Sequence, residues 1–140
     1  MYKRQQYIIL EADKGRIIQV ISNLLCNAIK FTTEGTITVT SEIKDSNALV
    51  SIKDTGQGLY PEVLPHLFTK FSTKSPLHGI QMGTGLGLFI SKSIVESHGG
   101  KIWAENNKDG SDATEGATFY FTLPIVNKEQ QEQPQQLPSK

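Results

Sequence analysis

The chain has few features that would cross-link it or anchor it to a membrane. Its 140 residues contain one cysteine, Cys26, so no disulfide can form within the chain. We expect Cys26 to be a small buried side chain in a protein of a reducing compartment. No stretch approaches the roughly 18–20 apolar residues that span a bilayer, and the polar start of the chain does not read as a secretory signal. The 14 Lys and Arg residues balance the 14 Asp and Glu residues, which gives no support to bulk binding of nucleic acid or of an anionic membrane.

The composition predicts one folded domain followed by a tail. Residues 1–125 have the apolar content of a soluble domain with a single core. Residues 126–140 are rich in Gln and Pro and have little to bury, so we expect them to be disordered. The domain itself is expected to be cytoplasmic and to make no direct membrane contact, although its parent protein could be tethered to a membrane elsewhere.

The spacing of apolar residues predicts two long helices. In residues 14–31 and 86–97 the apolar side chains recur at intervals of three and four. Asp13 is the predicted N-cap of the first helix, and the glycines of residues 98–100 end the second. A short helix is expected over residues 61–67, which have a proline in the first turn.

Several segments rich in β-branched residues predict a sheet. Two of these segments, residues 36–43 and 48–54, are predicted to form a hairpin that turns at residues 45–47. Together with the helices they predict a two-layer α/β sandwich, in which about three helices cover one face of a mixed, mostly antiparallel sheet. The predicted strands are residues 5–12, 36–43, 48–54, 101–106 and 116–124.

A polar stripe on the first helix is a candidate site for a metal and phosphates. Asn23, Asn27, Lys30 and Phe31 are spaced so that they share one side of the helix. An amide oxygen is a hard ligand that suits Mg²⁺, which takes few protein ligands and keeps phosphate oxygens and water as the others. Lys30 can offset phosphate charge. The alternative is an ordinary solvated helix face, although asparagine is a mediocre helix former that needs a reason at mid-helix.

A carboxylate followed by a glycine turn is a candidate base-reading site. Asp54 ends a strand that looks buried, and Gly56 and Gly58 follow it. Glycines allow a planar ligand to approach the backbone closely, and the carboxylate can accept a hydrogen bond from the exocyclic amine of adenine. The alternative is a simple Asp-x-Gly turn.

A glycine-rich run directly before the second helix is a candidate phosphate site. Main-chain N–H groups of residues 83–87 (Gly-Thr-Gly-Leu-Gly) can face an anion at the start of the helix. The alternative is a hinge, and residues 69–83 before it read as a mobile loop that could close as a lid. In this loop Lys70 and Lys74 are candidates to reach phosphates, whereas Phe68 and Phe71 could pin the loop to the core.

These segments, in this order, resemble the ATP-binding boxes of the histidine kinase catalytic domain. Residues 23–31 resemble its N box, 54–58 its first glycine box, 68–71 its phenylalanine box and 83–87 its second glycine box. Two further segments, residues 94–103 and 118–124, are also similar to that family. The resemblance covers about residues 7–124.

The resemblance implies the fold of the gyrase, Hsp90, histidine kinase and MutL superfamily, with ATP and Mg²⁺ as cofactors. Asn27 would carry Mg²⁺ with Asn23 beside it, Lys30 would meet phosphate, and Asp54 would bind the adenine amino group. The glycine run would hold the phosphates beneath a mobile lid. The full implied ATP-binding set is Asn23, Asn27, Lys30, Phe31, Asp54, Gly56, Gly58, Lys74, Thr84, Gly85, Leu86 and Gly87.

The resemblance also implies phosphoryl transfer rather than rapid hydrolysis. Hydrolysing members of the superfamily carry a glutamate where this chain has Asn23, and an amide cannot act as a base near neutral pH. In histidine kinases the acceptor is a histidine on a separate dimerisation domain, and a response-regulator receiver takes the phosphate afterwards. None of His66, His78 and His98 is followed by an acidic residue, so we expect the acceptor domain to be absent and this fragment to be monomeric.

Two alternatives stay open at this point. One is a non-catalytic regulatory module that reports nucleotide occupancy to a partner, and the other is an anti-sigma-type serine kinase on the same fold. The joint presence of Asn27 and Asp54 favours a kinase over a non-catalytic module. The phenylalanine box departs from the family pattern, because Thr69 stands where an acidic residue is usual.

Overall fold

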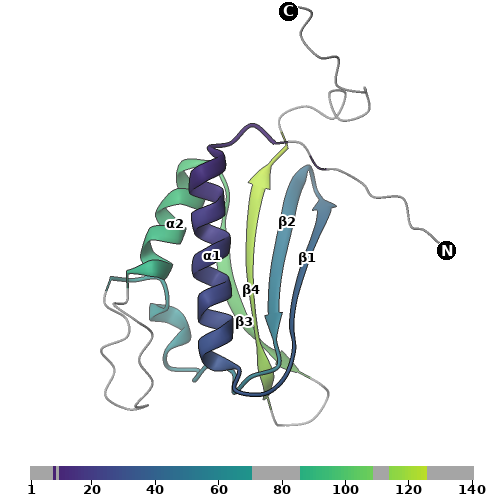
Figure 1. The fold of residues 1–140 in the computed structure, drawn as a ribbon. Coiled ribbons are helices and arrows are strands. Elements are labelled where there is room, and N and C mark those ends of the chain that lie inside the picture. The colour runs from purple at the N-terminus through teal and green to yellow at the C-terminus, as the bar shows by residue number, and fades with distance from the viewer. Residues whose placement is uncertain (1–7, 9, 71–85, 109–113, 126–140) are drawn as a thin grey trace, which may run out of the picture.

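The computed structural model describes residues 8, 10–70, 86–108 and 114–125. In chain order the elements are α1 (Lys14–Phe31), β1 (Ile37–Lys44), β2 (Asn47–Asp54), the 3-10 turn η1 (Leu64–His66), α2 (Gly87–Ser97), β3 (Ile102–Lys108) and β4 (Thr114–Pro124). The four strands form one sheet in the order β1-β2-β4-β3, and each neighbouring pair is antiparallel. Both α-helices cover the same face of this sheet (Figure 1).

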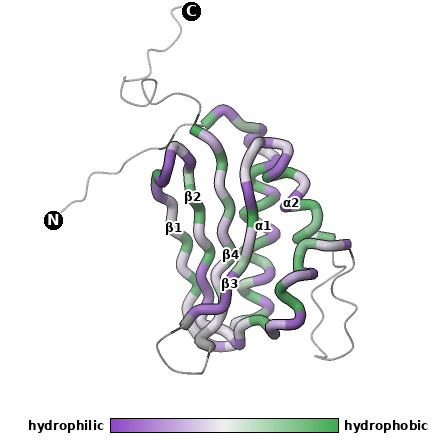
Figure 2. Tube along the Cα trace, turned by 180° about the vertical axis from the view of Figure 1, so that it is seen from behind, coloured by the Kyte–Doolittle hydropathy of each residue, from purple (hydrophilic) through white to green (hydrophobic). Residues whose placement is uncertain are grey.

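The predicted two-layer sandwich is confirmed, with differences in detail. Seen from behind, the sheet and the helices form separate layers, and both carry hydrophobic stretches, drawn in green (Figure 2). The described strands pair only in the antiparallel sense, and the described part of the expected first strand, Ile8 and residues 10–12, is not in a strand. The rest of that segment lies outside the described residues, as do residues 71–83 of the predicted lid and the predicted tail.

Helix α1 begins and ends at the predicted residues, and Asp13 is its N-cap as predicted. The Asp13 carboxylate accepts a hydrogen bond from the Arg16 N–H at 3.2 Å, which satisfies one of the free donors of the first turn. Val20, Leu24 and Ala28 are fully buried on one side of the helix. The expected helix over residues 61–67 is reduced to the three residues of η1, because Pro65 has no N–H to continue an α-helix.

The β1–β2 hairpin uses a two-residue turn. Asp45 and Ser46 have φ angles of 52° and 64°, and Lys44 pairs with Asn47 across the turn. A turn of this hand matches the twist of the flanking strands. Strand β1 lies at the edge of the sheet, and its Val39 and Ile43 remain exposed although they alternate toward the helix side.

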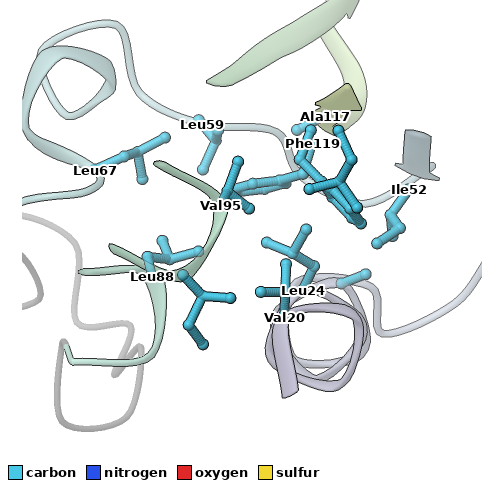
Figure 3. Packing of buried hydrophobic residues seen from close by; sticks show 13 residues of the cluster. Val20, Leu24, Ile52, Leu59, Leu67, Leu88, Val95, Ala117 and Phe119 are labelled. Atoms are coloured by element: carbon cyan, nitrogen blue, oxygen red, sulfur yellow. The ribbon is translucent and has the colours of Figure 1, made fainter. Parts of the chain in front are cut away.

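The core fills the space between the sheet and the helices. Figure 3 shows Val20 and Leu24 of α1 packing toward Ile52 and Phe119 of the sheet. The ring of Phe68 meets that of Phe119 edge-on, with centroids 6.3 Å apart, so the predicted packing of Phe68 is confirmed. The contiguous buried cluster comprises Val20, Leu24, Ala28, Ile52, Leu59, Leu67, Leu88, Ile94, Val95, Ala117, Phe119, Phe121 and Leu123.

The C-terminus of α2 ends in the glycine motif that the sequence predicts. Gly99 has φ 82°, its N–H bonds the Glu96 carbonyl at 3.0 Å, and the Gly100 N–H bonds the Val95 carbonyl at 2.9 Å. This pair of bonds is the Schellman arrangement, which satisfies carbonyl groups at a helix end. Among the described helices, none has both the length and the apolar character needed to cross a bilayer.

Candidate nucleotide-binding site

Two polar contacts join the antiparallel pair of α1 and α2. Near the start of α2, the Asn23 amide donates from Nδ2 to the Gly87 carbonyl oxygen and to Ser91 Oγ, each at 3.2 Å. At the other end, the Asp13 N–H donates to His98 Nε2 at 3.1 Å, and His98 Nδ1 lies 2.8 Å from the Ile94 carbonyl oxygen. Asn23 is therefore fixed between the helices, and the predicted stripe begins at the level where α2 starts.

Asn27 lies one turn beyond this contact. Four residues of α-helix advance about 6 Å along the axis, so Asn27 sits past the level of Gly87. It is a buried polar residue, 7% exposed. Lys30 is exposed in the last turn of α1, whereas Phe31 is buried. Along the predicted stripe, Asn23 contacts the other helix, Asn27 is a buried amide, and Lys30 is an exposed cation.

Asp54 is a buried carboxylate with one oxygen held in place. It ends β2 and is 1% exposed. Its Oδ1 accepts hydrogen bonds from the Gly56 N–H at 2.9 Å and from the Ala117 N–H at 3.2 Å. Burying an ionised carboxylate is costly unless donors surround it. Both described bonds engage Oδ1, so Oδ2 is the oxygen on which a ligand donor would be accepted.

Glycines allow the chain to close around this carboxylate. A Cβ on Gly56 would collide with the Phe31 carbonyl oxygen at the end of α1, and that same oxygen accepts the Gln57 N–H at 3.3 Å. Gly116 has φ 86°, and a Cβ there would collide with the Asp54 carbonyl oxygen. The close approach of β4 to Asp54 therefore requires glycine at position 116, a residue that the sequence reasoning did not single out.

Two asparagines of β3 are further residues that the sequence reasoning missed. Asn106 Oδ1 accepts from the Leu59 N–H at 2.7 Å, and its Nδ2 donates to the Leu59 carbonyl at 2.7 Å. Asn107 Nδ2 donates to the Asp54 carbonyl at 2.9 Å, and its Oδ1 accepts from Thr118 Oγ1 at 2.5 Å. The available signal was composition, because two consecutive asparagines are unusual within a strand.

The glycine-rich run is described only at its end. Leu86 is the N-cap of α2 and Gly87 its first residue, and leucine has no polar side chain to cap the first-turn N–H groups. Thr84, Gly85 and Lys74 of the predicted site, and Phe71 beside them, lie outside the described residues. Lys70, a candidate to reach phosphate, instead places its Nζ 5.0 Å from the centre of the Phe89 ring.

Two other observations bear on where the site lies. The prediction that Cys26 is buried is wrong, since the side chain is exposed on α1. A hollow of about 810 Å³ is lined by residues that include Thr38, Ser51, Lys53 and Asn107 but by none of the predicted ATP-binding set. The predicted site is thus marked by buried polar groups between the sheet and the helices rather than by that hollow.

Comparison with known proteins shows the family to which the chain belongs. Residues 12–127 match the model of the family described as histidine kinase-, DNA gyrase B-, and HSP90-like ATPase. The chain is 43% identical over 122 residues to Sensor protein KdpD of Clostridium acetobutylicum, covering 86% of this chain and 13% of that protein. It is 42% identical over 127 residues to Sensor histidine kinase ZraS of Klebsiella oxytoca, covering 89% of this chain and 25% of that protein. The chain therefore spans a quarter or less of these relatives.

Solved structures share the fold. The catalytic domain of histidine kinase ThkA matches with a TM-score of 0.69 and 38% identity, covering 83% of this chain and 71% of that one. Full-length ShkA in complex with AMPPNP matches with a TM-score of 0.69 and 30% identity, covering 86% of this chain and 24% of that one. ThkA in complex with the response regulator TrrA matches with a TM-score of 0.65 and 37% identity, covering 84% of this chain and 30% of that one.

Proposed function

Because the chain belongs to the family of histidine kinase-, DNA gyrase B-, and HSP90-like ATPases, we propose that it binds ATP with Mg²⁺ and donates the γ-phosphoryl group to a histidine on a separate domain. The observation that carries the proposal is the buried Asp54 carboxylate, whose Oδ1 is fixed by two main-chain donors. Its Oδ2 then accepts a hydrogen bond from the exocyclic amine of adenine. Guanine presents a carbonyl at the corresponding position, which would oppose one acceptor to another, so the site selects adenine.

The residues toward the start of α2 fit the phosphate end of the nucleotide. Asn27 is a buried amide beyond the level of Gly87, and Lys30 adds a positive charge one turn further along α1. Main-chain N–H groups at the start of α2 suit phosphate oxygens, and we assign Lys74, Thr84 and Gly85 to the same end by their place in the sequence. Mg²⁺, held by Asn27, would neutralise phosphate charge when bound. An amide that supplies one oxygen leaves the other positions of the ion to phosphate and water.

Four residues before the proposed metal residue, at position 23, the chain has an amide rather than a general base. Asn23 stands where hydrolysing members of the superfamily carry a glutamate, and its amide nitrogen is bonded to Gly87 and Ser91. An amide does not take a proton from water near neutral pH, so bound ATP is hydrolysed slowly. Phosphoryl transfer depends mainly on positioning and charge stabilisation, which lets the nucleophile come from another domain.

We further propose the partners and setting of this reaction. The acceptor is a histidine of a dimerisation and phosphoacceptor domain, and the next acceptor is a response-regulator receiver. Support for the second partner comes from ThkA, a relative of similar fold whose structure is a complex with the response regulator TrrA. The domain works in the cytoplasm, where ATP is available, and is monomeric as this fragment.

Transfer of labelled phosphate tests the proposal. The chain is incubated with Mg²⁺ and γ-labelled ATP, together with a histidine-bearing acceptor domain from a sensor kinase of this family. Label should appear on the acceptor, survive base and be lost in acid, as a phosphohistidine is. An acceptor whose histidine is replaced by alanine is the control and should stay unlabelled.

The other outcomes separate the alternatives. Nucleotide binding without any transfer to the intact acceptor would leave a non-catalytic regulatory module. Label that survives acid and remains when the histidine is replaced would indicate a serine kinase.

A further inference from the structure

The loop between Asp54 and Leu59 is held at both ends by one pair of neighbouring side chains. Asn107 donates to the carbonyl oxygen of Asp54, where the loop begins. Asn106 bonds both the N–H and the carbonyl of Leu59, where the loop ends, each at 2.7 Å. The loop carries Gly56, whose N–H fixes the Asp54 carboxylate. Two consecutive residues of the edge strand β3 therefore hold both ends of the loop that contacts the Asp54 carboxylate.

Asn106 and Asn107 bond main-chain groups beyond the point where the hydrogen-bonded pairing of β2 with β4 ends. The last residue pair between β2 and β4 is Lys53 with Thr118, and the β3–β4 register shifts between Asn106 and Lys108. Beyond the last pair, the Asp54 carbonyl accepts from a side chain rather than from a strand neighbour. Leu59 is 8% exposed, so its main-chain groups need partners within the protein. Asn106 supplies both partners at once.

We propose that Asn106 and Asn107 are positioning residues that determine base selectivity by fixing the loop that orients the Asp54 carboxylate. The inference rests on the proposed adenine site but assigns a role to residues outside it. A neutral amide can hold an N–H and a carbonyl together without bringing a charge next to the carboxylate. We call the side-chain bonds from Asn106 and Asn107 to the main chain of Leu59 and Asp54 the clamp. When the clamp is removed, the loop and the Gly56 N–H move, and Oδ2 is no longer aimed at the exocyclic amine. The loss should therefore fall on adenine nucleotides more than on guanine nucleotides.

Calorimetry with ADP and competition with GDP test this role. Asn106→Ala removes both bonds to Leu59. Asn106→Asp keeps an acceptor for the Leu59 N–H but loses the donor to the Leu59 carbonyl. We expect Asn106→Ala to weaken ADP binding at least tenfold and to lower the ADP-to-GDP affinity ratio by a similar factor. Asn106→Asp should give an intermediate loss of about threefold. The matched control is Asn47→Ala in the hairpin turn, which also loses an amide bond to a main-chain carbonyl and should stay within twofold of the unaltered chain.

The outcomes separate the clamp from the binding site itself. If the unaltered chain binds no ADP, the proposed adenine site is overturned, and the clamp with it. If the unaltered chain binds ADP and both Asn106 variants keep its affinity and base preference within twofold, the clamp alone is overturned. Equal losses for ADP and GDP would mean a merely structural role and would also overturn it. Thermal unfolding shows which variants are folded, and if Asn106→Ala is not, Asn106→Asp and Asn107→Ala decide between the same outcomes.

Discussion

Asn23 of α1 donates from its Nδ2 to the Gly87 carbonyl oxygen of α2 at 3.2 Å. The same nitrogen reaches Ser91 Oγ, a fully buried hydroxyl one turn further along α2. The Asn23 amide is thus a hydrogen-bond donor that joins the two helices. Its contribution to stability can therefore be separated from any role in chemistry.

Replacing Asn23 by aspartate should destabilise the fold. The ionised side chain has no proton to donate and would set a carboxylate oxygen against the Gly87 carbonyl. Since the site is half-buried, we expect the free energy of unfolding to fall by about 1–2 kcal/mol, measured by chemical denaturation. Ser22→Asp adds the same charge at the exposed neighbouring position and should change it by less than about 0.5 kcal/mol. Equal effects would mean that charge on the helix, not the lost contact, is responsible.

Asp54→Asn tests the base-reading oxygen directly. The amide would keep its oxygen on the Gly56 and Ala117 N–H groups, so its NH₂ group would replace Oδ2 and face the adenine amine, donor against donor. We expect ADP affinity to fall at least tenfold, roughly 1.4 kcal/mol, by calorimetry. Lys101→Ala removes an exposed side chain and should leave binding unchanged. Comparable losses in the two variants would show that the pocket lies elsewhere.

Glycine substitutions should have opposite signs at two positions. A Cβ at position 56 would collide with the Phe31 carbonyl oxygen, so Gly56→Ala must displace the loop and should cost about 1–3 kcal/mol of stability. At Gly15 the nearest neighbour of a Cβ is Asp13 Oδ1 at 3.6 Å, an ordinary contact. Gly15→Ala should therefore stabilise the first turn of α1 by about 0.5–1 kcal/mol. Thermal and denaturant unfolding measure both, and a tolerated Gly56→Ala would refute the close approach.

His98→Ala should loosen the far end of the helix pair. The Asp13 N–H points at Nε2, so Nε2 is the acceptor and the proton on Nδ1 is donated to the Ile94 carbonyl. Loss of both bonds should reduce stability by about 1–2 kcal/mol. His66→Ala, an exposed histidine on η1, is the control and should be nearly neutral in the same denaturation experiment. If the two variants behave alike, the His98 contacts contribute no net stability.

Asn27→Asp probes the proposed metal residue. The change keeps the shape of the side chain but adds a negative charge where the ion would bind. We expect the Mg²⁺ concentration at half-maximal ATP binding to shift at least threefold, because carboxylate and amide oxygens differ in their attraction for the ion. Ser22→Asp again controls for charge on α1. An unchanged magnesium titration would remove Asn27 from the metal role.

The sequence predicted features whose signals are local. Helix α1 was predicted to the residue because its N-cap and its apolar spacing lie within the segment, and the hairpin strands were shifted by only one residue. The helix predicted over residues 61–67 was too long, because the prediction did not take into account that Pro65 prevents the α-helix from continuing. Residues 5–12 have strand-like composition, but their described part forms no strand.

Parts of the site that depend on distant partners could not be predicted in this way. Asn106 meets Leu59, Asn107 meets Asp54, and Ser91 meets Asn23, all across 47 to 68 residues of sequence. No periodicity or turn signal encodes such pairs. Gly116 was likewise read only as the start of a strand, although its positive φ and its contact with Asp54 set the approach of β4.

The two polar contacts between α1 and α2 have a mechanical consequence. Asp13 meets His98 at one level and Asn23 meets Gly87 at another, so sliding either helix along the other would break a bond at both levels. The two helices should therefore move together as one rigid unit. A displacement of one helix should thus be transmitted to the other, and shear between the two is the motion that this pair resists.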